Sequence, residues 1–325
     1  MSYQKTEVLI VGGGPAGAAC AGALRQNGVD CLVLDKATFP RSKPCAGWIT
    51  PEIFQALKVN PADYPHGLTT FRSFRIEFPR AKFKLPVRQY AIRRYEFDEW
   101  LLNRSGATVV NHEVKTIVTR SGGYEIDGKF FGKNLVGAGG THCPVYRTFF
   151  QSTAPRDADA LVIAREDEFP YRTTDPQCRL WFSENDLPGY AWFVPKTDGY
   201  VNFGIGGLAV SLKQKGETLK QHWDLLQQRL EEAGLLRDYT RRPVGHYYYR
   251  RGRPQRVRHE NAFLAGDAAS LATYDMGEGI RAAIMSGQRV AQAIVHDSAY
   301  DITAIPKYSL PSILKSGLKS LVSLS

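Results

Sequence analysis

Several features that would place the chain in a special class of protein are scarce or missing. Five cysteines in 325 residues, spread from Cys20 to Cys178, are too scattered for a disulfide framework or a metal site such as a zinc centre. No run of about 18 uncharged apolar residues occurs, so no membrane-spanning helix is predicted. The first seven residues lack an apolar signal region, which predicts a cytoplasmic protein. With 43% hydrophobic residues, the composition is that of a globular protein.

Acidic residues are outnumbered by basic ones, 32 against 42, and the formal net charge is +10. The excess gathers in two stretches, residues 72–94 with eight Lys and Arg and residues 241–258 with seven Arg and no acid. Such stretches are typical of a solvated basic face. They also fit attraction to an anionic membrane surface, a diphosphate-bearing substrate or an acidic redox partner. No nucleic-acid recognition motif accompanies the charge, so no nucleic acid is expected as partner.

The N-terminal part of the chain carries the strongest motif. Residues 8–11 are a short apolar run with the length and β-branching of a buried strand. They lead into residues 12–17, Gly-Gly-Gly-Pro-Ala-Gly, which fit G-x-G-x-x-G, and an Ala-rich helix to about Asn27 follows. A second apolar run at 31–34 ends at Asp35. Strand, glycine turn, helix, strand and acidic end together predict a dinucleotide-binding unit.

Each residue type in this motif has a physical role. Gly12 permits the tight turn, Gly14 lets the backbone approach a pyrophosphate, and Gly17 lets helix and strand pack closely. The helix N-terminus offers free N–H groups and a positive dipole end to the phosphates. Asp35 lies where a carboxylate accepts hydrogen bonds from an adenosine ribose, which indicates FAD or NAD rather than NADP. The expected contacts here are Gly12, Gly14, Pro15, Ala16, Gly17, Asp35 and Lys36.

A polar, proline-rich loop at residues 37–48 follows the nucleotide-binding unit, and long loops in such places are often functional. Its Cys45 is either a gap-filling side chain or an exposed thiol close to a cofactor. Thr50 and Pro51 then predict an N-cap and a first helical residue, with a helix to about Lys58.

The fold class predicted is α/β (α+β overall), a Rossmann-like domain with an inserted antiparallel β-sheet domain. The first comprises residues 1–70, 91–155 and 256–299. The inserted substrate-binding domain comprises residues 71–90 and 156–255, in which aromatic strands are interrupted by a single amphipathic helix near 219–233. Residues 300–325 form a short basic amphipathic segment, either a packed terminal helix or one lying on a membrane interface.

Four separated motifs carry a resemblance to a known family. They are the glycine motif with Asp35, Arg94-Tyr95-Glu96-Phe97-Asp98, Ala138-Gly139-Gly140, and Gly266-Asp267-Ala268-Ala269. From Val8 to about Val295 the chain resembles FAD-dependent oxidoreductases of the aromatic-hydroxylase superfamily, and within it the geranylgeranyl reductases. Residues 43–47 are similar to that branch's Lys-x-Cys-(Gly/Ala)-Gly loop. Residues 190–196 are similar to its Tyr-x-Trp-x-Phe-Pro-Lys motif.

The resemblance implies roles for further residues. Arg94 would pair with the phosphate region of the cofactor, Asp267 would hydrogen-bond its ribitol or pyrophosphate, and a helix start at 277–280 would place N–H groups beside the flavin. The implied FAD contacts are Arg41, Cys45, Ala46, Gly47, Arg94, Ala138, Gly139, Gly266, Asp267, Gly277, Gly279 and Ile280. The implied substrate contacts are Tyr190, Trp192 and Pro195. Cys45 and Tyr190 are the candidate catalytic residues, each a possible source of the proton that the substrate receives during reduction.

The chain also departs from the family pattern. Gly139 replaces the usual Asp of Ala-Asp-Gly, Cys143 stands where Ser is common, and residues 273–276 replace a proline-rich element. The chain is shorter than usual members and lacks most of a C-terminal helical portion, so the length of the substrate cannot be transferred from the family.

The predicted function is reduction of C=C bonds of an isoprenoid or lipid-like substrate, with hydride from reduced flavin N5. Because only one dinucleotide fingerprint occurs, the electron donor is expected to be a transiently bound NAD(P)H or a protein such as ferredoxin. The rival within flavoenzymes is an FAD-dependent monooxygenase or halogenase. The rival of another class is a flavin-binding electron-transfer or regulatory module with no organic substrate of its own.

Overall fold

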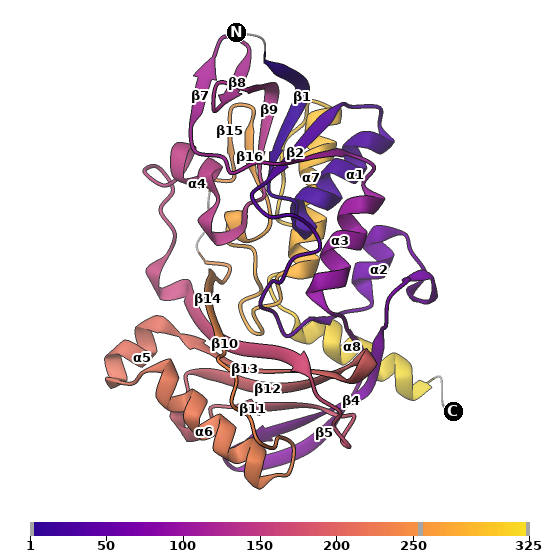
Figure 1. The fold of residues 1–325 in the computed structure, drawn as a ribbon, viewed down its shortest axis with the longest axis vertical. Helices are drawn as coiled ribbons and strands as arrows, with labels where there is room; N and C mark the ends of the chain where they lie inside the picture. The colour runs from indigo at the N-terminus through magenta and orange to yellow at the C-terminus, as the bar shows by residue number, and fades with distance from the viewer. Residues whose placement is uncertain (1–2, 253–255, 323–325) are drawn as a thin grey trace. The chain divides into compact units, whose positions relative to one another are not determined.

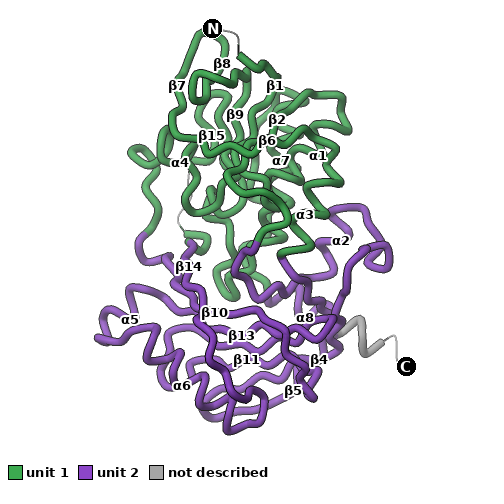
Figure 2. Tube along the Cα trace, viewed as in Figure 1, with its two compact units in different colours: residues 1–41, 95–157, 249–309 green, residues 42–94, 158–248, 310–325 purple. Residues whose placement is uncertain are grey.

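A computed structural model describes residues 3–252 and 256–322, with side chains as far as Gly317 (Figure 1). The chain forms two compact units (Figure 2). Unit 1 comprises residues 1–41, 95–157 and 249–309, and unit 2 comprises residues 42–94, 158–248 and 310–325. Residues 42–70, placed in the cofactor domain from sequence, therefore fall in unit 2. The reason is strand pairing, because β3 and β4 both join the sheet of unit 2.

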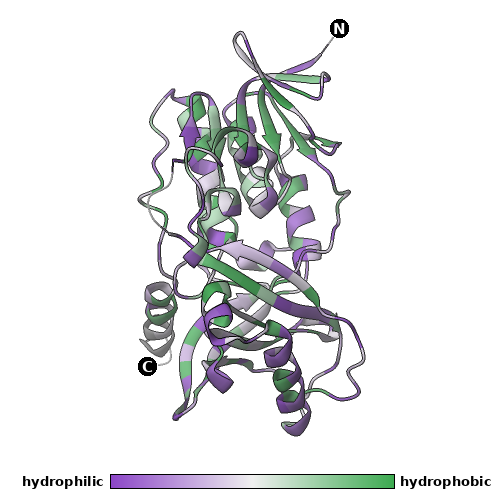
Figure 3. Cartoon of the chain, turned by 90° about the vertical axis from the view of Figure 1, so that its left-hand side faces the viewer, coloured by the Kyte–Doolittle hydropathy of each residue, from purple (hydrophilic) through white to green (hydrophobic). Residues whose placement is uncertain are grey.

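Unit 1 is built on a mainly parallel sheet in the order β15-β16-β9-β1-β2-β6. The parallel pairs are β1 with β2, β1 with β9, β9 with β16, and β2 with β6. Strands buried on both faces are expected to be continuous apolar runs, and the central strands are coloured mainly as hydrophobic in Figure 3. The strands are β1 (Gln4–Val11), β2 (Cys31–Asp35), β6 (Thr108–Asn111), β7 (Ile117–Arg120), β8 (Gly123–Ile126), β9 (Phe130–Gly137), β15 (Arg258–His259) and β16 (Ala262–Leu264).

Two helices of unit 1, α1 (Pro15–Gln26) and α7 (Ile280–Val295), pack closely against each other. A Cβ atom added to Gly287 of α7 would lie 2.1 Å from the carbonyl oxygen of Ala16, so only glycine permits this crossing. The sequence predicted that α7 starts within residues 277–280, and the structure places its first residue at the end of that range. The helix begins at Ile280, because the N–H of Gly277 bonds back to the carbonyl of Thr273 in a turn.

Unit 2 is built on one mainly antiparallel sheet in the order β14-β10-β13-β12-β11-β4-β5-β3. Its one parallel pair among the registers described joins β11 to β4, two segments about a hundred residues apart in the chain. The strands are β3 (Trp48–Ile49), β4 (Thr69–Phe78), β5 (Ala81–Ala91), β10 (Leu161–Pro170), β11 (Cys178–Phe182), β12 (Gly189–Lys196), β13 (Tyr200–Leu208) and β14 (Val244–Tyr249).

One face of this sheet is covered by α6 (Leu219–Glu232), whose Trp223, Leu226 and Leu230 are buried in a shared core. The core takes alternate residues of the strands, such as Phe193 of β12 and Phe203 of β13. The prediction of a single helix in this region is wrong, because α5 (Ala209–Lys215) follows β13 directly.

Three further helices are α2 (Glu52–Leu57), α3 (Arg94–Arg104) and α4 (Pro144–Phe149). The predicted N-cap at Thr50 is wrong. Pro51 occupies the cap position of α2, and the buried hydroxyl of Thr50 has no hydrogen-bond partner among the described residues.

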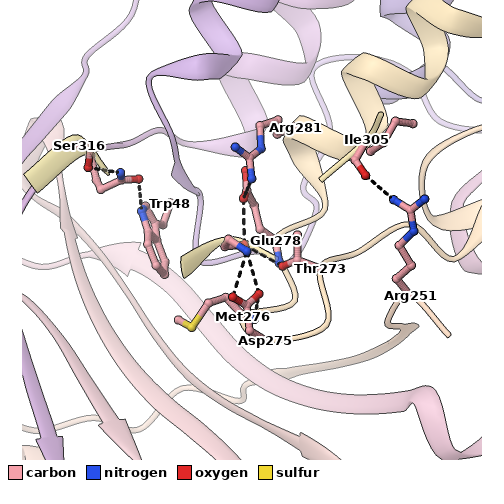
Figure 4. A network of polar contacts seen from close by, with 11 residues as sticks. Trp48, Arg251, Thr273, Asp275, Met276, Glu278, Arg281, Ile305 and Ser316 are labelled. Atoms are coloured by element: carbon pink, nitrogen blue, oxygen red, sulfur yellow. Dashed lines mark hydrogen bonds and ion pairs between the residues drawn. The ribbon is translucent and has the colours of Figure 1, made fainter. Parts of the chain in front are cut away.

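The C-terminal helix α8 (Leu310–Val322) packs on β5. The Ser316 hydroxyl accepts hydrogen bonds from the backbone N–H of Arg88 and from Gln89, which also bonds Trp48 (Figure 4). A Cβ atom at Gly317 would lie 2.2 Å from the carbonyl oxygen of Pro86. Of the two predicted alternatives, the structure therefore shows the packed terminal helix. Among the described residues, none of the helices has the length and apolar character needed to cross a bilayer.

Candidate functional site

The predicted cofactor contacts of unit 1 gather at the carboxyl edge of its parallel sheet. Parallel strands end at a common edge, where ligands of such folds bind. The segments after β1, β2, β9 and β16 hold Gly12 to Gly17, Asp35 and Lys36, Ala138 and Gly139, and Gly266 and Asp267, respectively. The structure thus brings together all four segments that the sequence assigned to the cofactor, and their contacts with FAD stay a prediction.

The turn after β1 is as narrow as its glycines allow. Gly12 has φ of +110°, and a Cβ atom there would lie 2.5 Å from the carbonyl oxygen of Ala138 and 2.7 Å from the N of Gly139. A Cβ atom at Gly17 would lie 1.8 Å from the carbonyl oxygen of Gly12. No side chain caps α1 at Gly14, and Pro15 is its first residue. The first N–H groups of α1 are therefore not taken by a side-chain cap and suit a phosphate.

Asp35 is held at the mouth of this turn. Its carboxylate accepts hydrogen bonds from the backbone N–H of Gly13 at 2.6 Å and of Ala37 at 2.8 Å. Because each carboxylate oxygen has a second lone pair, these bonds orient the group and leave acceptor capacity for ribose hydroxyls.

Arg41 lies on the other side of the turn. Its Nη2 is 3.1 Å from the carboxylate of Asp98, which is fully buried, and 3.3 Å from where a Cβ atom of Gly14 would be. The buried carboxylate of Asp98 holds this cation beside the glycine turn. Asp98 is thus a positioning residue, and its appearance in the Arg94 motif was the sequence signal for it.

The start of α7 is fixed by a polar network (Figure 4). Thr273 Oγ1 accepts from the N–H of Glu278, and the Glu278 carboxylate accepts from Arg281 at 3.1 Å and from Ser309 at 3.0 Å. These bonds hold the segment that replaces the family's proline-rich element. Gly279, the N-cap of α7, has no side-chain cap, and a Cβ atom there would lie 3.2 Å from Oδ1 of Asp267.

Arg156 was missed from sequence because nothing in its neighbourhood marks it. Its guanidinium donates to the carbonyl oxygens of Thr141 at 2.5 Å and Ala268 at 3.1 Å and lies over the ring of Tyr146. It therefore ties the loop after β9 to the loop after β16. Burial lowers the pKa of Arg156 from its usual value.

In unit 2 the Cys45 loop is docked on strands. The carbonyl oxygen of Cys45 accepts a hydrogen bond from Asn202 at 3.3 Å, and its Sγ accepts one from the N–H of Gly47 at 3.4 Å. Gly47 has φ of +69°, and a Cβ atom there would lie 2.1 Å from the carbonyl oxygen of Ile92 and 2.6 Å from Nζ of Lys196. Ala46 is therefore part of a loop in close backbone contact with the sheet.

The sheet face that α6 does not cover carries Tyr190 and Trp192. The Trp192 indole lies over glycines of β13, since a Cβ atom at Gly204 would be 2.5 Å from its ring, and its Nε1–H donates to Asn202 at 2.7 Å. Pro195 has the opposite parity on β12 and lies on the α6 face beside Val201. The structure thus places two of the three predicted substrate residues on one face and the third on the other.

A row of aromatic rings continues from Trp192 across this face to β5. Successive ring centroids lie 5.7, 5.2, 5.1 and 6.3 Å apart. Two of the rings are more than 40% exposed at the far end of the row. The members are Trp192, Tyr190, Phe182, Phe78 and Phe83.

Other polar residues of unit 2 were not identified from sequence. Glu166 and Glu168 on β10, Lys196 on β12, Asn202 on β13 and His246 on β14 lie in one cluster beside the Cys45 loop. A run of three consecutive acids at residues 166–168, in a strand with apolar ends, was the available signal. Arg94 is 8% exposed, and its charge helps lower the pKa of His246. Its pairing with a cofactor phosphate stays a prediction.

Comparison with known proteins agrees with this geometry. Residues 5–59 match the family described as FAD binding domain. The chain is 31% identical to an uncharacterized protein of Methanosarcina barkeri over 98% of this chain and 82% of that protein. It is 27% identical to menaquinone reductase of Mycobacterium tuberculosis, over 90% and 77%. It is 26% identical to digeranylgeranylglycerophospholipid reductase 1 of Methanopyrus kandleri, over 92% and 82%.

The fold has a matching solved structure as well. A geranylgeranyl bacteriochlorophyll reductase-like protein from Thermoplasma acidophilum superposes with a TM-score of 0.80 at 20% identity, covering 99% of this chain and 87% of that one. The chain is an FAD-dependent oxidoreductase, and these relatives bear out its resemblance to the geranylgeranyl reductases. Its cofactor is FAD, and the narrow glycine turn with an α1 N-terminus that lacks a side-chain cap fits the pyrophosphate of that group.

The five cysteines differ in how exposed their thiols are to solvent. Cys45 is half-buried, whereas the other four thiols are buried. Burial raises the pKa of the Cys31 thiol to about 11 and raises those of Cys20, Cys143 and Cys178. Because the thiolate is the reactive form, we expect a maleimide to modify one site rapidly in the native protein. Mass spectrometry should locate the label at Cys45, and rapid labelling of a second cysteine would contradict the assignment.

Part of the basic stretch 72–94 forms a cationic row on the α6 face. Lys84 of β5 is directly opposite Arg75 of β4, which is paired in register with Arg179 of β11. The row lines a cleft of about 660 Å³. Arg179 pairs with Asp175, but Arg75 and Lys84 have no ion pair among the described residues. Like charges in direct cross-strand contact are destabilising.

Replacing Lys84 by glutamate should therefore raise the free energy of unfolding by roughly 0.2–1 kcal/mol, because the new carboxylate faces Arg75. Urea denaturation measures the change, and Lys84→Gln should give a smaller rise. A loss of stability in Lys84→Glu would show that the row is not under mutual repulsion.

Proposed function

We propose that this FAD-dependent oxidoreductase reduces C=C bonds of an isoprenoid or similar lipid-like substrate. The observation that carries the proposal is the aromatic row from Trp192 to Phe83 on the sheet face left open by α6. Exposed apolar area of this kind commonly marks a binding site. A long apolar chain with repeated methyl groups matches a row of partly exposed rings better than a compact polar substrate does.

The residues of unit 2 would orient this substrate and exclude water. Trp192 is fixed by its hydrogen bond to Asn202 and by the glycines beneath its ring, so its face is presented in one orientation. Tyr190 and Phe182 extend the apolar surface. When bound, reduced FAD supplies the hydride for one alkene carbon.

The second alkene carbon needs a proton. Cys45 and Tyr190 are the residues proposed to supply it, because Cys45 is the accessible thiol and the Tyr190 ring lies beside that of Trp192. The Cys45 carbonyl is bonded by the same Asn202 that orients Trp192. This shared partner links the position of the loop to that of the aromatic row.

The electron donor is proposed to be NAD(P)H or a protein such as ferredoxin. The basic residues on the α6 face suit an anionic nucleotide or an acidic protein surface. Peripheral contact with an anionic membrane is proposed for α8, where Leu310 and Leu314 are exposed beside Lys315. Measuring binding to vesicles with and without anionic lipid tests the proposed membrane contact.

The function is tested by incubating dithionite-reduced protein anaerobically with geranylgeranyl lipids and measuring the products by mass spectrometry. Each reduced bond adds two hydrogens. We expect such products with oxygen excluded. Unchanged lipid under these conditions, with hydroxylated or halogenated products in air, would instead identify a monooxygenase or halogenase. Bound FAD without turnover of any organic substrate would identify an electron-transfer module.

A further inference from the structure

The most unusual polar group of unit 2 is the carboxyl of Glu166 on β10. The residue is 1% exposed, and neither carboxylate oxygen has a hydrogen-bond partner among the described residues. Its neighbour Glu168 differs, because Glu168 pairs with Arg93 at 3.1 Å and with Lys196. Buried polar groups in native proteins are almost always satisfied, so an orphaned carboxyl calls for a functional explanation.

Glu166 lies on the same sheet face as the aromatic row. It is in register with Gly204 of β13, which is in register with Trp192 of β12. A Cβ atom at Gly204 would lie 2.6 Å from Cβ of Glu166 and 2.5 Å from the Trp192 ring. The Glu166 side chain therefore lies beside the Trp192 ring, which is proposed to contact the substrate. It is also near Asn202, whose side chain donates to the carbonyl oxygen in the Cys45 loop.

A second orphaned group faces Glu166 from β14. Nδ1 of His246 is 3.6 Å from Oε1 of Glu166 and has no hydrogen-bond partner among the described residues. The His246 side chain is 18% exposed against 2% for that of Glu166, so the imidazole is the group nearer to solvent. The two side chains therefore form a pair of titratable groups that face each other from β10 and β14.

Their surroundings set the charge state of the pair. Burial raises the pKa of Glu166 to about 7, although the charges of Lys196 and Lys43 act to lower it, and the charge of Glu168 raises it further. Burial, Lys43 and Arg94 lower the pKa of His246 to about 4. Near neutral pH the carboxyl is therefore partly protonated while the imidazole is neutral, which is the state of a proton donor with a neutral relay beside it.

We propose that Glu166 is the proton store of the reaction site and that His246 reloads it from solvent. The role rests on the proposed C=C reduction. In that reaction two C–H bonds replace one C–C π bond, one hydrogen arriving as the hydride and the other as a proton. The proton leaves the Glu166 carboxyl towards the Cys45 side, Glu166 becomes a carboxylate, and a solvent proton passed through His246 restores the acid. Glu166 thus acts through the residues that touch the substrate.

The test uses the FAD-loaded variants Glu166→Gln and Glu166→Asp with Asp167→Asn as matched control. Asp167 is the next residue on β10, and it is bonded to Tyr239 and Arg241 on the α6 face. We expect wild-type kcat to fall above a pH of about 7, where Glu166 loses its proton. Glu166→Gln should lower kcat roughly 100-fold and abolish the fall of kcat at alkaline pH. Glu166→Asp should recover part of the rate and part of this pH dependence. The control should keep the wild-type profile.

Infrared spectroscopy supplies a readout that needs no turnover. The wild type should show a protonated-carboxyl C=O band on the acid side of neutrality that disappears at alkaline pH and is missing in Glu166→Gln. Failure of the wild type to reduce any alkene would overturn the proposed function and this role with it. Alkene reduction by the wild type with an unchanged rate and pH profile in Glu166→Gln would overturn this inference alone, as would absence of the infrared band.

Discussion

Replacing Gly17 by alanine is expected to remove most of the FAD from the protein. The added Cβ atom would lie 1.8 Å from the carbonyl oxygen of Gly12, so α1 must move away from β1. Losing two charge-assisted hydrogen bonds from its N-terminus to the pyrophosphate costs about 3 kcal/mol, which is about a 100-fold rise in the FAD dissociation constant. The ratio of flavin to protein absorbance after purification, with FAD titration into the apoprotein, measures the effect.

Gly22→Ala on the same helix is the matched control. A Cβ atom there would meet Ser105 at 3.5 Å, an ordinary contact, and alanine is the better helix former. This variant should retain stoichiometric FAD and unfold at the wild-type temperature or above. Wild-type affinity for FAD in Gly17→Ala would mean that the turn after β1 does not bind the pyrophosphate.

Replacing Cys45 by alanine is expected to lower the rate of alkene reduction by about 100-fold or more, the range for loss of a general acid. FAD content should stay unchanged, because the loop is docked through backbone atoms. Asn202 bonds the carbonyl oxygen of Cys45, and the N–H of Ile92 bonds the carbonyl of Gly47. Anaerobic single-turnover kinetics with the flavin reduced beforehand separate this step from delivery of electrons.

Two further variants distinguish the role of the thiol from simple packing. Cys45→Ser keeps the shape but has a far weaker acid, so it should be impaired nearly as much as Cys45→Ala. Cys31→Ala removes a buried thiol from β2 and should keep the wild-type rate with a small loss of stability. Full activity in Cys45→Ala would exclude Cys45 from the proton side.

The cofactor site was accessible to sequence reasoning because its determinants are local. Gly12, Gly14, Gly17 and Asp35 lie within one strand–helix–strand unit, where spacing alone predicts which backbone groups meet a ligand. The family resemblance, the fold class and FAD are all confirmed. Within the predicted range 277–280, the first residue of α7 was not predictable in the same way, because Ser309 and Arg281 hold the preceding turn through Glu278.

The proton-store residues of unit 2 could not be identified from sequence for a different reason. Glu166, Asp167 and Glu168 are consecutive acids. Only their surroundings in the folded sheet decide that the first has no hydrogen-bond partner among the described residues, the second faces α6 and the third pairs with two cations. Those surroundings depend on β13 and β14, which are distant in the chain. Pro195 is separated from Tyr190 and Trp192 by the alternation of side chains along β12 itself.

The central claim is that this chain reduces C=C bonds with electrons held on its FAD. The most direct measurement is flavin absorbance in a stopped-flow mixing of anaerobic, fully reduced protein with a geranylgeranyl lipid. We predict that the oxidised-flavin spectrum returns without oxygen in a single phase, because one reduced FAD holds the electron pair for one C=C bond, and that the product is heavier by two hydrogens. Flavin that stays reduced until air is admitted, with the lipid unchanged, would contradict the claim.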